Sequence, residues 1–318
     1  MARNIEDYII EIARQASSGL GGTLNLSSLC QIGGARGKGW VTDAGLAFYI
    51  DGHRRADDVV LLVASPSFGH TVATNVAAAR RAAGQVDEAV GRHIARPIYE
   101  GQHEAQSFAV FSRLSPVSDT KIIRYLQRSG VTARVTPWLI QLAQQTRRMA
   151  QDAADYDRLF IAPLIGLSDD ADVAQPIRDF AKSLAAQVQK DRPDLFTVMQ
   201  HDDFWVGNIM FERRRYEALN PALGDFAVID WRGVRLDGYP GLDLSRYCRS
   251  IYSPGDARTR AIMRDYGAAL GVSSRDMSLY LMLALGRLGA ELDQFPKQRY
   301  ASMCDKVFRL LQTHILDS

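Results

Sequence analysis

The stretch "HDDFWVGNIMF", residues 201–211, decides how this sequence is interpreted. It sets two adjacent aspartates, Asp202 and Asp203, among large apolar residues, and Asn208 follows five positions after the second aspartate. Carboxylates avoid apolar surroundings unless a partner stabilises them. Five residues are enough for the chain to leave Asp203 as a loop and return as a strand at Asn208, so the stretch predicts one loop that presents both side chains.

A second acidic segment, "FAVIDWRGVRLDGYPGLDLSRY", covers residues 226–247. Asp230 ends the apolar run "FAVI" and lies 22 residues beyond Asn208, and Asp243 lies in "GLDLSR". Carboxylate and amide oxygens suit Mg²⁺, which takes few protein ligands and completes its shell with water and phosphate oxygens. The two segments together therefore indicate a magnesium-dependent site at strand ends, where one carboxylate could orient an attacking hydroxyl.

The remaining sequence divides into a β-rich part and a helical part. Before Pro116 we expect a short helix at residues 5–16, three strands, an Ala-rich helix at residues 71–91 and two more strands. Beyond Pro116 the pattern is mainly helical, and only residues 206–235 have β character. The helices predicted in this part cover residues 119–129, 136–158, 173–191, 256–270 and 275–315.

We therefore predict an α+β fold of two domains. Residues 1–115 form a small antiparallel β-rich N-terminal domain with one helix, and residues 116–318 form a larger, mostly helical C-terminal domain. The expected hinge lies at Arg113–Pro116. The acidic segments fall in the helical domain, inside its one β-like region.

The pattern His-x-Asp-x-x-x-x-Asn, followed by an apolar strand and Ile-Asp-Trp, resembles the catalytic core of the protein-kinase-like superfamily. More narrowly, it resembles the aminoglycoside phosphotransferase and choline kinase group, whose members carry His-Gly-Asp-x-x-x-x-Asn and Ile-Asp-Phe or Ile-Asp-Trp. The motifs cover residues 201–247, and beyond them only the order of elements is similar. The resemblance implies a bilobal protein-kinase-like fold, nucleotide binding in the N-terminal lobe, and ATP and Mg²⁺ as cofactors.

The resemblance also implies a role for each matching residue. Asp203 would orient the substrate hydroxyl or accept its proton, and Asn208 and Asp230 would hold Mg²⁺. His201 would pack beneath the loop, and Asp243 would support the loop through hydrogen bonds. The alternative is that these acids are solvated loop residues or helix caps.

The N-terminal domain departs from the family pattern. Family members usually carry a lysine on the third strand, paired with a glutamate on the following helix. The third predicted strand, "VVLLVASPS", contains no cation, and Ala64 or Ser65 stands where the lysine is expected. The first acids of the next helix, Asp87 and Glu88, lie near its end. Two interpretations stay open at this point: another cation compensates, or the protein is a catalytically impaired kinase-like binding module. Nucleotidyl transfer on the same fold is a further alternative.

A compensating cation is available in "GGARGKG", residues 33–39, between the first two predicted strands. Family members have their phosphate-covering loop at this place, and glycines let a backbone approach phosphates closely. Lys38 is the preferred substitute for the missing lysine; the alternative is an ordinary hairpin turn with solvated basic residues. The predicted nucleotide-binding residues are Gly33, Gly34, Arg36, Gly37 and Lys38.

Composition excludes several other classes of function. With 38 basic and 36 acidic residues, the net charge of +2 gives no field that would favour nucleic acid or a membrane surface. The cysteines, Cys30, Cys248 and Cys304, are odd in number and far apart, which fits neither a disulfide framework nor a zinc site. The N-terminus has no apolar signal core and no run suits a membrane span, so we expect a cytoplasmic protein.

The expected function is transfer of the γ-phosphoryl of ATP to a hydroxyl of a small metabolite, sugar or aminoglycoside-like acceptor. A small molecule is favoured over a protein because no Ala-Pro-Glu follows Asp230 and the chain soon reaches Asp243. The sequence does not indicate which acceptor binds, nor an oligomeric state. Four acids of the helical domain could meet a cationic acceptor or could be surface residues: Asp256, Asp265, Glu291 and Asp293.

Overall fold

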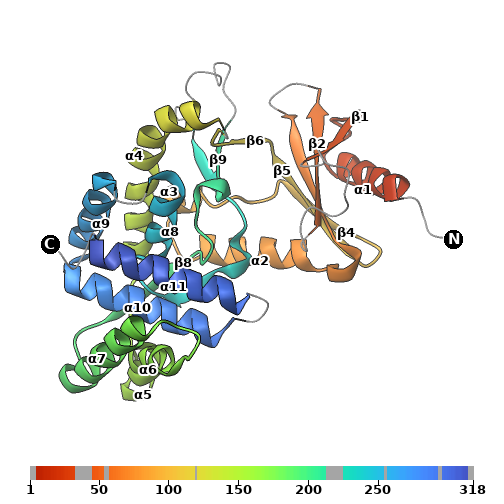
Figure 1. Cartoon of the computed structure of the whole chain (residues 1–318). Coiled ribbons are helices and arrows are strands. Elements are labelled where there is room, and N and C mark those ends of the chain that lie inside the picture. Colours follow the sequence, from red (N-terminus) through yellow and green to blue (C-terminus); the bar gives the residue numbers. More distant parts are fainter. Residues whose placement is uncertain are drawn as a thin grey trace. The chain divides into compact units, whose positions relative to one another are not determined.

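The chain forms two compact units, labelled by element in Figure 1. One comprises residues 1–127 and 207–233, and the other comprises residues 128–206 and 234–318. The short segment 207–233, which contains Asn208 and Asp230, therefore belongs with the N-terminal part of the chain. The division into domains at residue 116 stays a prediction. This computed structural model describes residues 5–32, 45–53, 57–118, 120–212, 225–253, 256–292 and 296–313.

The first unit is built on a five-stranded antiparallel sheet. Side chains alternate between the two faces of a strand, and β3 shows why both faces are covered. Leu61 and Val63 pack with helix α1, whereas Leu62 and Ala64 pack with helix α2. The strands, in sheet order, are β1 (Leu24–Gln31), β2 (Gly45–Gly52), β3 (Val59–Ala64), β5 (Gln106–Ser112) and β4 (Tyr99–His103), and the helices are α1 (Ile5–Gly19), α2 (Thr71–Ala83) and α3 (Glu88–Gly91).

A smaller sheet completes this unit and carries two of the predicted site residues. Its strands are ordered β10-β9-β6, with β6 at Leu114–Pro116, β9 at Ile209–Glu212 and β10 at Phe226–Val228. A parallel bridge between Ile94 and Val228 ties β10 to the segment that follows α3. The β-like region predicted at residues 206–235 therefore folds as the hairpin β9–β10.

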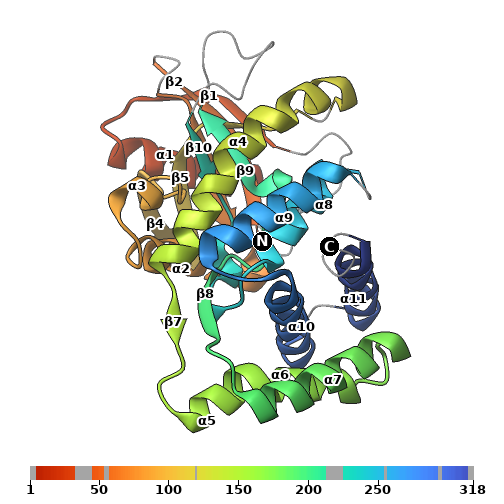
Figure 2. The ribbon, with the colours of Figure 1, turned by 90° about the vertical axis from the view of Figure 1, so that its left-hand side faces the viewer.

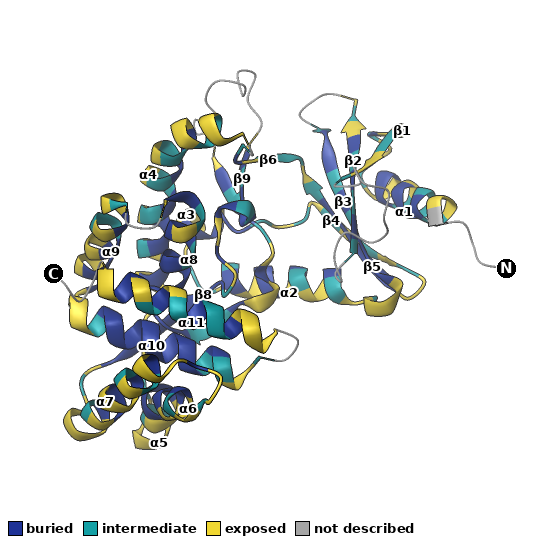
Figure 3. Cartoon of the chain, viewed as in Figure 1, coloured by how far each residue is buried: buried dark blue, intermediate teal, exposed yellow. Residues whose placement is uncertain are grey.

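The second unit is mainly helical and centres on α10. Helix α10 is buried around most of its circumference, as expected for a helix that is apolar on all sides, and Figure 3 shows it largely dark blue. Helix α6 packs against both α10 and α7 (Figure 2). The helices are α4 (Lys121–Gln145, which begins in the first unit), α5 (Ala153–Tyr156), α6 (Ala162–Asp169), α7 (Gln175–Asp191), α8 (Leu242–Ile251), α9 (Ala257–Leu270), α10 (Ser274–Ala290) and α11 (Lys297–Leu311).

A three-stranded sheet in this unit leads into the acidic loop. Its order is β11-β8-β7, with β7 at Arg148–Met149, β8 at Phe196–Gln200 and β11 at Arg235–Gly238. All residues of β8 are buried, and both of its edges are paired. The central position of β8 fixes the point from which the next residues leave the sheet.

The predicted α+β class is confirmed, with differences in the helices. The helices predicted at residues 119–129 and 136–158 are replaced by one helix, α4, which ends at Gln145. A buried stripe at Val131, Val135, Trp138 and Leu142 runs through the expected break, and such packing overrides local propensity.

Other helical regions also differ from the prediction, and α6 lies in a segment where no helix was predicted. The helix predicted at 71–91 is two helices, because Asp87 caps the start of α3 by accepting a hydrogen bond from the backbone N–H of Val90. The segment predicted at 275–315 divides into α10 and α11, and α8 was not predicted. Across the described residues, no helix combines the length and apolar character that crossing a bilayer requires.

Candidate active site

The loop that follows β8 carries the first group of predicted site residues. His201 is fully buried, whereas the side chain of Asp203 is 64% exposed. Between them Asp202 has a φ of +70°, a left-handed conformation that residues other than glycine adopt uncommonly. This turn at Asp202 carries the chain from the buried strand to an exposed carboxylate within three residues.

Asp243, at the start of α8, supports the backbone of this loop. Its Oδ2 accepts a hydrogen bond from the backbone N–H of His201 at 2.6 Å, and its Oδ1 accepts one from Asp202 at 3.1 Å. The backbone N–H of Asp203 donates to Nδ1 of His201 at 3.3 Å. Burial raises the pKa of the Asp243 carboxyl to about 7, although the two backbone hydrogen bonds oppose that shift. The structure thus shows these contacts, and the roles assigned to His201, Asp243 and Asp203 stay predictions.

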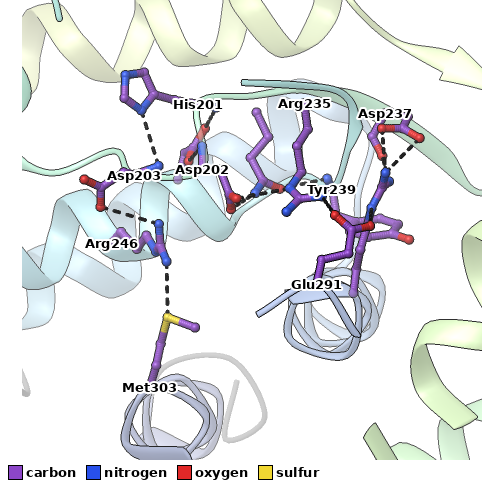
Figure 4. A network of polar contacts seen from close by, with 12 residues as sticks. His201, Asp202, Asp203, Arg235, Asp237, Tyr239, Arg246, Glu291 and Met303 are labelled. Atoms are coloured by element: carbon purple, nitrogen blue, oxygen red, sulfur yellow. Dashed lines mark hydrogen bonds and ion pairs between the residues drawn. The ribbon is translucent and has the colours of Figure 1, made fainter. Parts of the chain in front are cut away.

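The side chain of Asp202 belongs to a network of charged groups, shown in Figure 4. It accepts hydrogen bonds from Nε2 of Gln200 at 2.8 Å and from Nε of Arg235 at 3.1 Å. Arg235 also forms an ion pair with Glu291, just beyond α10, and Arg287 lies 3.4 Å from the same glutamate. Burial opposes the charge of Arg235, but the two carboxylates raise its pKa overall. The network therefore fixes the side chain of Asp202 through contacts with Gln200, at the end of β8, and Arg235, at the start of β11.

The side chain of Arg246 places a positive charge beside Asp203. Its Nη1 lies 3.7 Å from Oδ1 of Asp203, and its Nη2 donates to Sδ of Met303 at 3.3 Å (Figure 4). Sequence reasoning missed this residue because α8 was not predicted. Arg246 is three residues after Asp243, a spacing that places both on one helix face, so recognising the helix would have indicated it.

The second group of site residues lies in the first unit, at one end of the β9–β10 hairpin. Val228 is paired with Ile209, and the N–H of Ile229 donates to the carbonyl of Asn208 at 3.0 Å. Asp230 is exposed and has a φ of +62°, whereas Asn208 is buried. The register therefore brings Asn208 and Asp230 to the same end of the hairpin.

Backbone hydrogen bonds secure the strand that leads to Asp230. The N–H of Val228 donates to the carbonyl of His93 at 2.7 Å, and the N–H of Ala95 donates to the carbonyl of Val228 at 2.9 Å. Nε1 of Trp231 donates to the same carbonyl at 2.8 Å. The turn Trp231–Gly233 packs against α2, so this end of the hairpin is anchored on the N-terminal part of the chain.

The residues at this end of the hairpin fit a magnesium ion by their chemistry. One amide and one carboxylate, Asn208 and Asp230, offer hard oxygen atoms, and Mg²⁺ needs few such ligands when phosphates and water complete its shell. Within the described ranges, no three His, Cys, Asp or Glu side chains converge in a way that could hold a metal ion. An all-protein metal centre is therefore not what the described part offers.

The predicted nucleotide-binding residues cannot be placed: Gly33, Gly34, Arg36, Gly37 and Lys38 lie outside the described residues. The strands nearby confirm the missing lysine. None of the strands β1 to β5 contains Lys or Arg, and Ala64 ends β3. Helix α2 contains no acidic residue, and its Arg80 pairs with Glu100 of β4 at 2.6 Å. The family's ion pair is thus absent from β3 and α2.

Comparisons with known proteins agree with the motif. The sequence model of the ecdysteroid kinase-like family matches residues 102–260. Among solved structures, the chain is similar to a protein described as a fructosamine-3-kinase from Haemophilus somnus, with a TM-score of 0.46, 11% identity, and coverage of 86% of this chain and 90% of the other. No curated protein sequence matches.

Two further solved structures are similar. A choline/ethanolamine kinase family protein from Mesorhizobium loti has a TM-score of 0.45 at 13% identity, covering 88% of this chain and 92% of the other. The ethanolamine kinase of Plasmodium vivax has a TM-score of 0.44 at 9% identity, covering 91% of this chain and 85% of the other.

Proposed function

The chain belongs to the ecdysteroid kinase-like family, and we propose that it transfers the γ-phosphoryl group of ATP to a hydroxyl of a small molecule. The observation that carries this proposal is the loop at Asp203. An exposed carboxylate follows a buried strand, on a backbone that Asp243 holds through two hydrogen bonds. Phosphoryl transfer depends mainly on positioning and on electrostatic stabilisation, which such a supported loop can provide.

In the proposed reaction, the acceptor hydroxyl oxygen attacks the γ-phosphorus and forms the new P–O bond. The bond from the γ-phosphorus to the bridging oxygen breaks, and ADP leaves. Asp203 orients the hydroxyl and accepts its proton, as a positioned general base. Asn208 and Asp230 would hold Mg²⁺, which when bound neutralises charge on the phosphates.

The inner phosphates of ATP need a further cation, and the strands of the five-stranded sheet supply none. We assign this role to Lys38, in "GGARGKG", because phosphate sites commonly add a lysine or arginine. Lys38→Met removes the charge and keeps the apolar stem. It should raise KM for ATP or lower kcat by roughly tenfold or more, whereas Arg54→Met should change little.

The test is an ADP-release screen with the purified chain, ATP and Mg²⁺ against sugars, amino alcohols, hydroxy acids and aminoglycosides. Mass spectrometry of the product separates an added phosphoryl group from an added nucleotidyl group. A thermal shift with ATP, with and without Mg²⁺, runs in parallel; ligand at 100 times Kd stabilises by about 2.7 kcal/mol. Nucleotide binding without turnover on any acceptor would favour the binding-module alternative, and a nucleotidylated product would replace phosphoryl transfer by nucleotidyl transfer.

A further inference from the structure

An open pocket of about 390 Å³ lies between α8 and α11 in the second unit. Among the described residues that line it, three have cationic side chains and none has an acidic one. Ser302, Met303 and Lys306 line the pocket from α11, three, four and seven residues after Arg299. These spacings place the four residues on one face of the helix. The residues that line it are Arg249, Gln298, Arg299, Ser302, Met303 and Lys306.

The cations of this pocket have no charged partner among the residues that the structure describes. In the part of the chain that the structure describes, Arg249, Arg299 and Lys306 form no ion pair, whereas Lys297 on the same helix pairs with Asp172 at 3.2 Å. Burial, together with the charge of the neighbouring Arg246, lowers the pKa of Arg249. The charges of Arg246 and Arg249 therefore disfavour each other, and an anion bound beside Arg249 would relieve that repulsion.

The side chain of Arg246 contacts both the lining of the pocket and Asp203, the predicted catalytic residue. Met303 lines the pocket and accepts a hydrogen bond from Arg246, whose other terminal nitrogen is 3.7 Å from Asp203. That nitrogen, Nη1, is buried and has no hydrogen-bond partner among the described residues. A molecule held in the pocket could therefore contact Met303, which is hydrogen-bonded to the arginine beside Asp203, the carboxylate proposed to accept the hydroxyl proton.

Three of the four acids that could have bound a cationic acceptor lie beside the chain's own arginines. Asp256 lies 3.7 Å from Arg128 and also caps α9, and Asp265 lies 3.6 Å from Arg264. Glu291 pairs with both Arg235 and Arg287, and Asp293 lies outside the described residues.

We propose that this pocket binds an anionic group of the acceptor, a carboxylate or a phosphate ester. Arginine guanidinium groups present paired N–H donors that match both anions, and Arg249 and Arg299 supply two of them. The acceptor is then a hydroxyl compound that carries an anionic group, rather than an amino sugar or a choline-like cation. As a statement about the acceptor, the inference rests on the proposed function; as a statement about anion binding, it stands without it.

The binding test uses three small probes with the same carbon skeleton: glycerate, glycerol 3-phosphate and neutral glycerol. Their effect on the melting temperature of the full chain is measured without ATP, at constant ionic strength. At least one anionic probe should raise it in the wild type, and glycerol should not. The pocket variant Arg249→Gln/Arg299→Gln/Lys306→Gln should lose the shift. The control variant Arg258→Gln/Arg264→Gln/Arg309→Gln, which removes the same charge from exposed positions outside the pocket lining, should keep it.

Which anion gives the larger shift decides between a carboxylate and a phosphate ester. No shift with either anion, or equal shifts in the wild type and the pocket variant, would overturn the inference. The transfer assay then separates this inference from the proposed function. The pocket variant should raise KM for an anionic acceptor by roughly tenfold or more with little change in kcat, the pattern of lost ground-state binding.

Two results of the combined tests have distinct meanings. Anion binding that the pocket variant abolishes, in a protein that transfers nothing to any acceptor, would reject the proposed function and keep the pocket. Efficient transfer to cationic or neutral acceptors, with the same KM in the wild type and the pocket variant, would keep the proposed function and reject the pocket.

Discussion

The loop at Asp203 and the turn at Asp230 both contain an aspartate with positive φ, but they are supported by different interactions. At the loop, Asp202 has a φ of +70° and its carboxylate is bound by Gln200 and Arg235, while Asp243 binds the backbone. At the turn, Asp230 has a φ of +62° and an exposed side chain. There, backbone hydrogen bonds and the indole of Trp231 provide the support.

This difference shows which carboxylates are exposed in each region. Charged side chains that maintain the loop, such as Asp202 and Asp243, are engaged by the protein, so Asp203 is the carboxylate left exposed there. Support by backbone groups leaves the carboxylate of Asp230 available to a metal ion. The stability of the loop should therefore depend on pH and should fall when a charge is removed, whereas the stability of the turn should depend on neither.

The largest effect is expected for Asp203→Ala. Loss of a positioned base should lower kcat by roughly 10²–10⁴-fold, with little change in the affinity for ATP and Mg²⁺, because the proposed metal ligands lie in the other region. Steady-state kinetics and calorimetric titration measure the two quantities. Turnover close to that of the wild type would show that the loop does not carry the base.

A pH series tests the electrostatic support of the loop. The pKa of Asp243 rises from 3.8 to about 7 on folding, so between about pH 4 and pH 7 the folded state keeps a proton that the unfolded state loses. Stability from this group is therefore present at low pH and is lost as the pH rises, by at most about 1.4 kcal/mol per pH unit for one proton.

Urea unfolding of the wild type and Asp243→Asn at several pH values measures this contribution. As the pH rises through this window, the unfolding free energy of the wild type should fall relative to that of Asp243→Asn. Trp231→Phe, in the other region, should follow the pH dependence of the wild type. A constant difference between wild type and Asp243→Asn would contradict the assignment.

Arg235→Met tests the charged network directly. It leaves the carboxylate of Asp202 without its ion pair in a site where that side chain is only 13% exposed. We expect a loss of about 1–3 kcal/mol in unfolding free energy. Arg264→Met, whose arginine is 71% exposed beside Asp265, is the matched control and should cost less than about 1 kcal/mol. Equal losses in the two variants would mean that the network adds nothing at the loop.

Asp230→Asn removes one carboxylate charge from the turn and should leave the fold intact. It should weaken Mg²⁺-dependent binding of ATP by roughly tenfold, about 1.4 kcal/mol, and by more than Asp203→Ala does. Calorimetric titration with ATP, with and without Mg²⁺, gives the comparison. Unchanged affinity and unchanged metal dependence would remove Asp230 from the proposed metal site.

The smallest effect is expected for Trp231→Phe, which deletes one buried hydrogen bond to the carbonyl of Val228. Two backbone contacts at Val228 remain, so the loss should be about 0.5–1.5 kcal/mol in unfolding free energy. Chemical denaturation at a single pH measures it. A loss larger than that of Arg235→Met would mean that the Trp231 hydrogen bond contributes more at the turn than the charged network contributes at the loop.

Sequence patterns predicted the fold class well because both parts of the chain have clear local periodicity. The β-rich part, β structure within residues 206–235 and the helices near 173–191 and 256–270 all form. The prediction failed where long-range packing competes with local signals. Helix α4 continues through Pro137 along a buried stripe, and α8, although it follows Gly241 and carries several polar residues, is buried around most of its circumference.

The sequence by itself determined which chemical groups are present and how they are spaced. Asp203, Asn208 and Asp230 can be identified from their order along the chain, and so can the absence of a lysine from the third strand. Only the tertiary structure decided what surrounds them. Arg246, Met303 and the cationic pocket meet across elements some 50 residues apart, and such meetings depend on how helices pack. Local periodicity reports which face of an element is buried, but not which other element covers it.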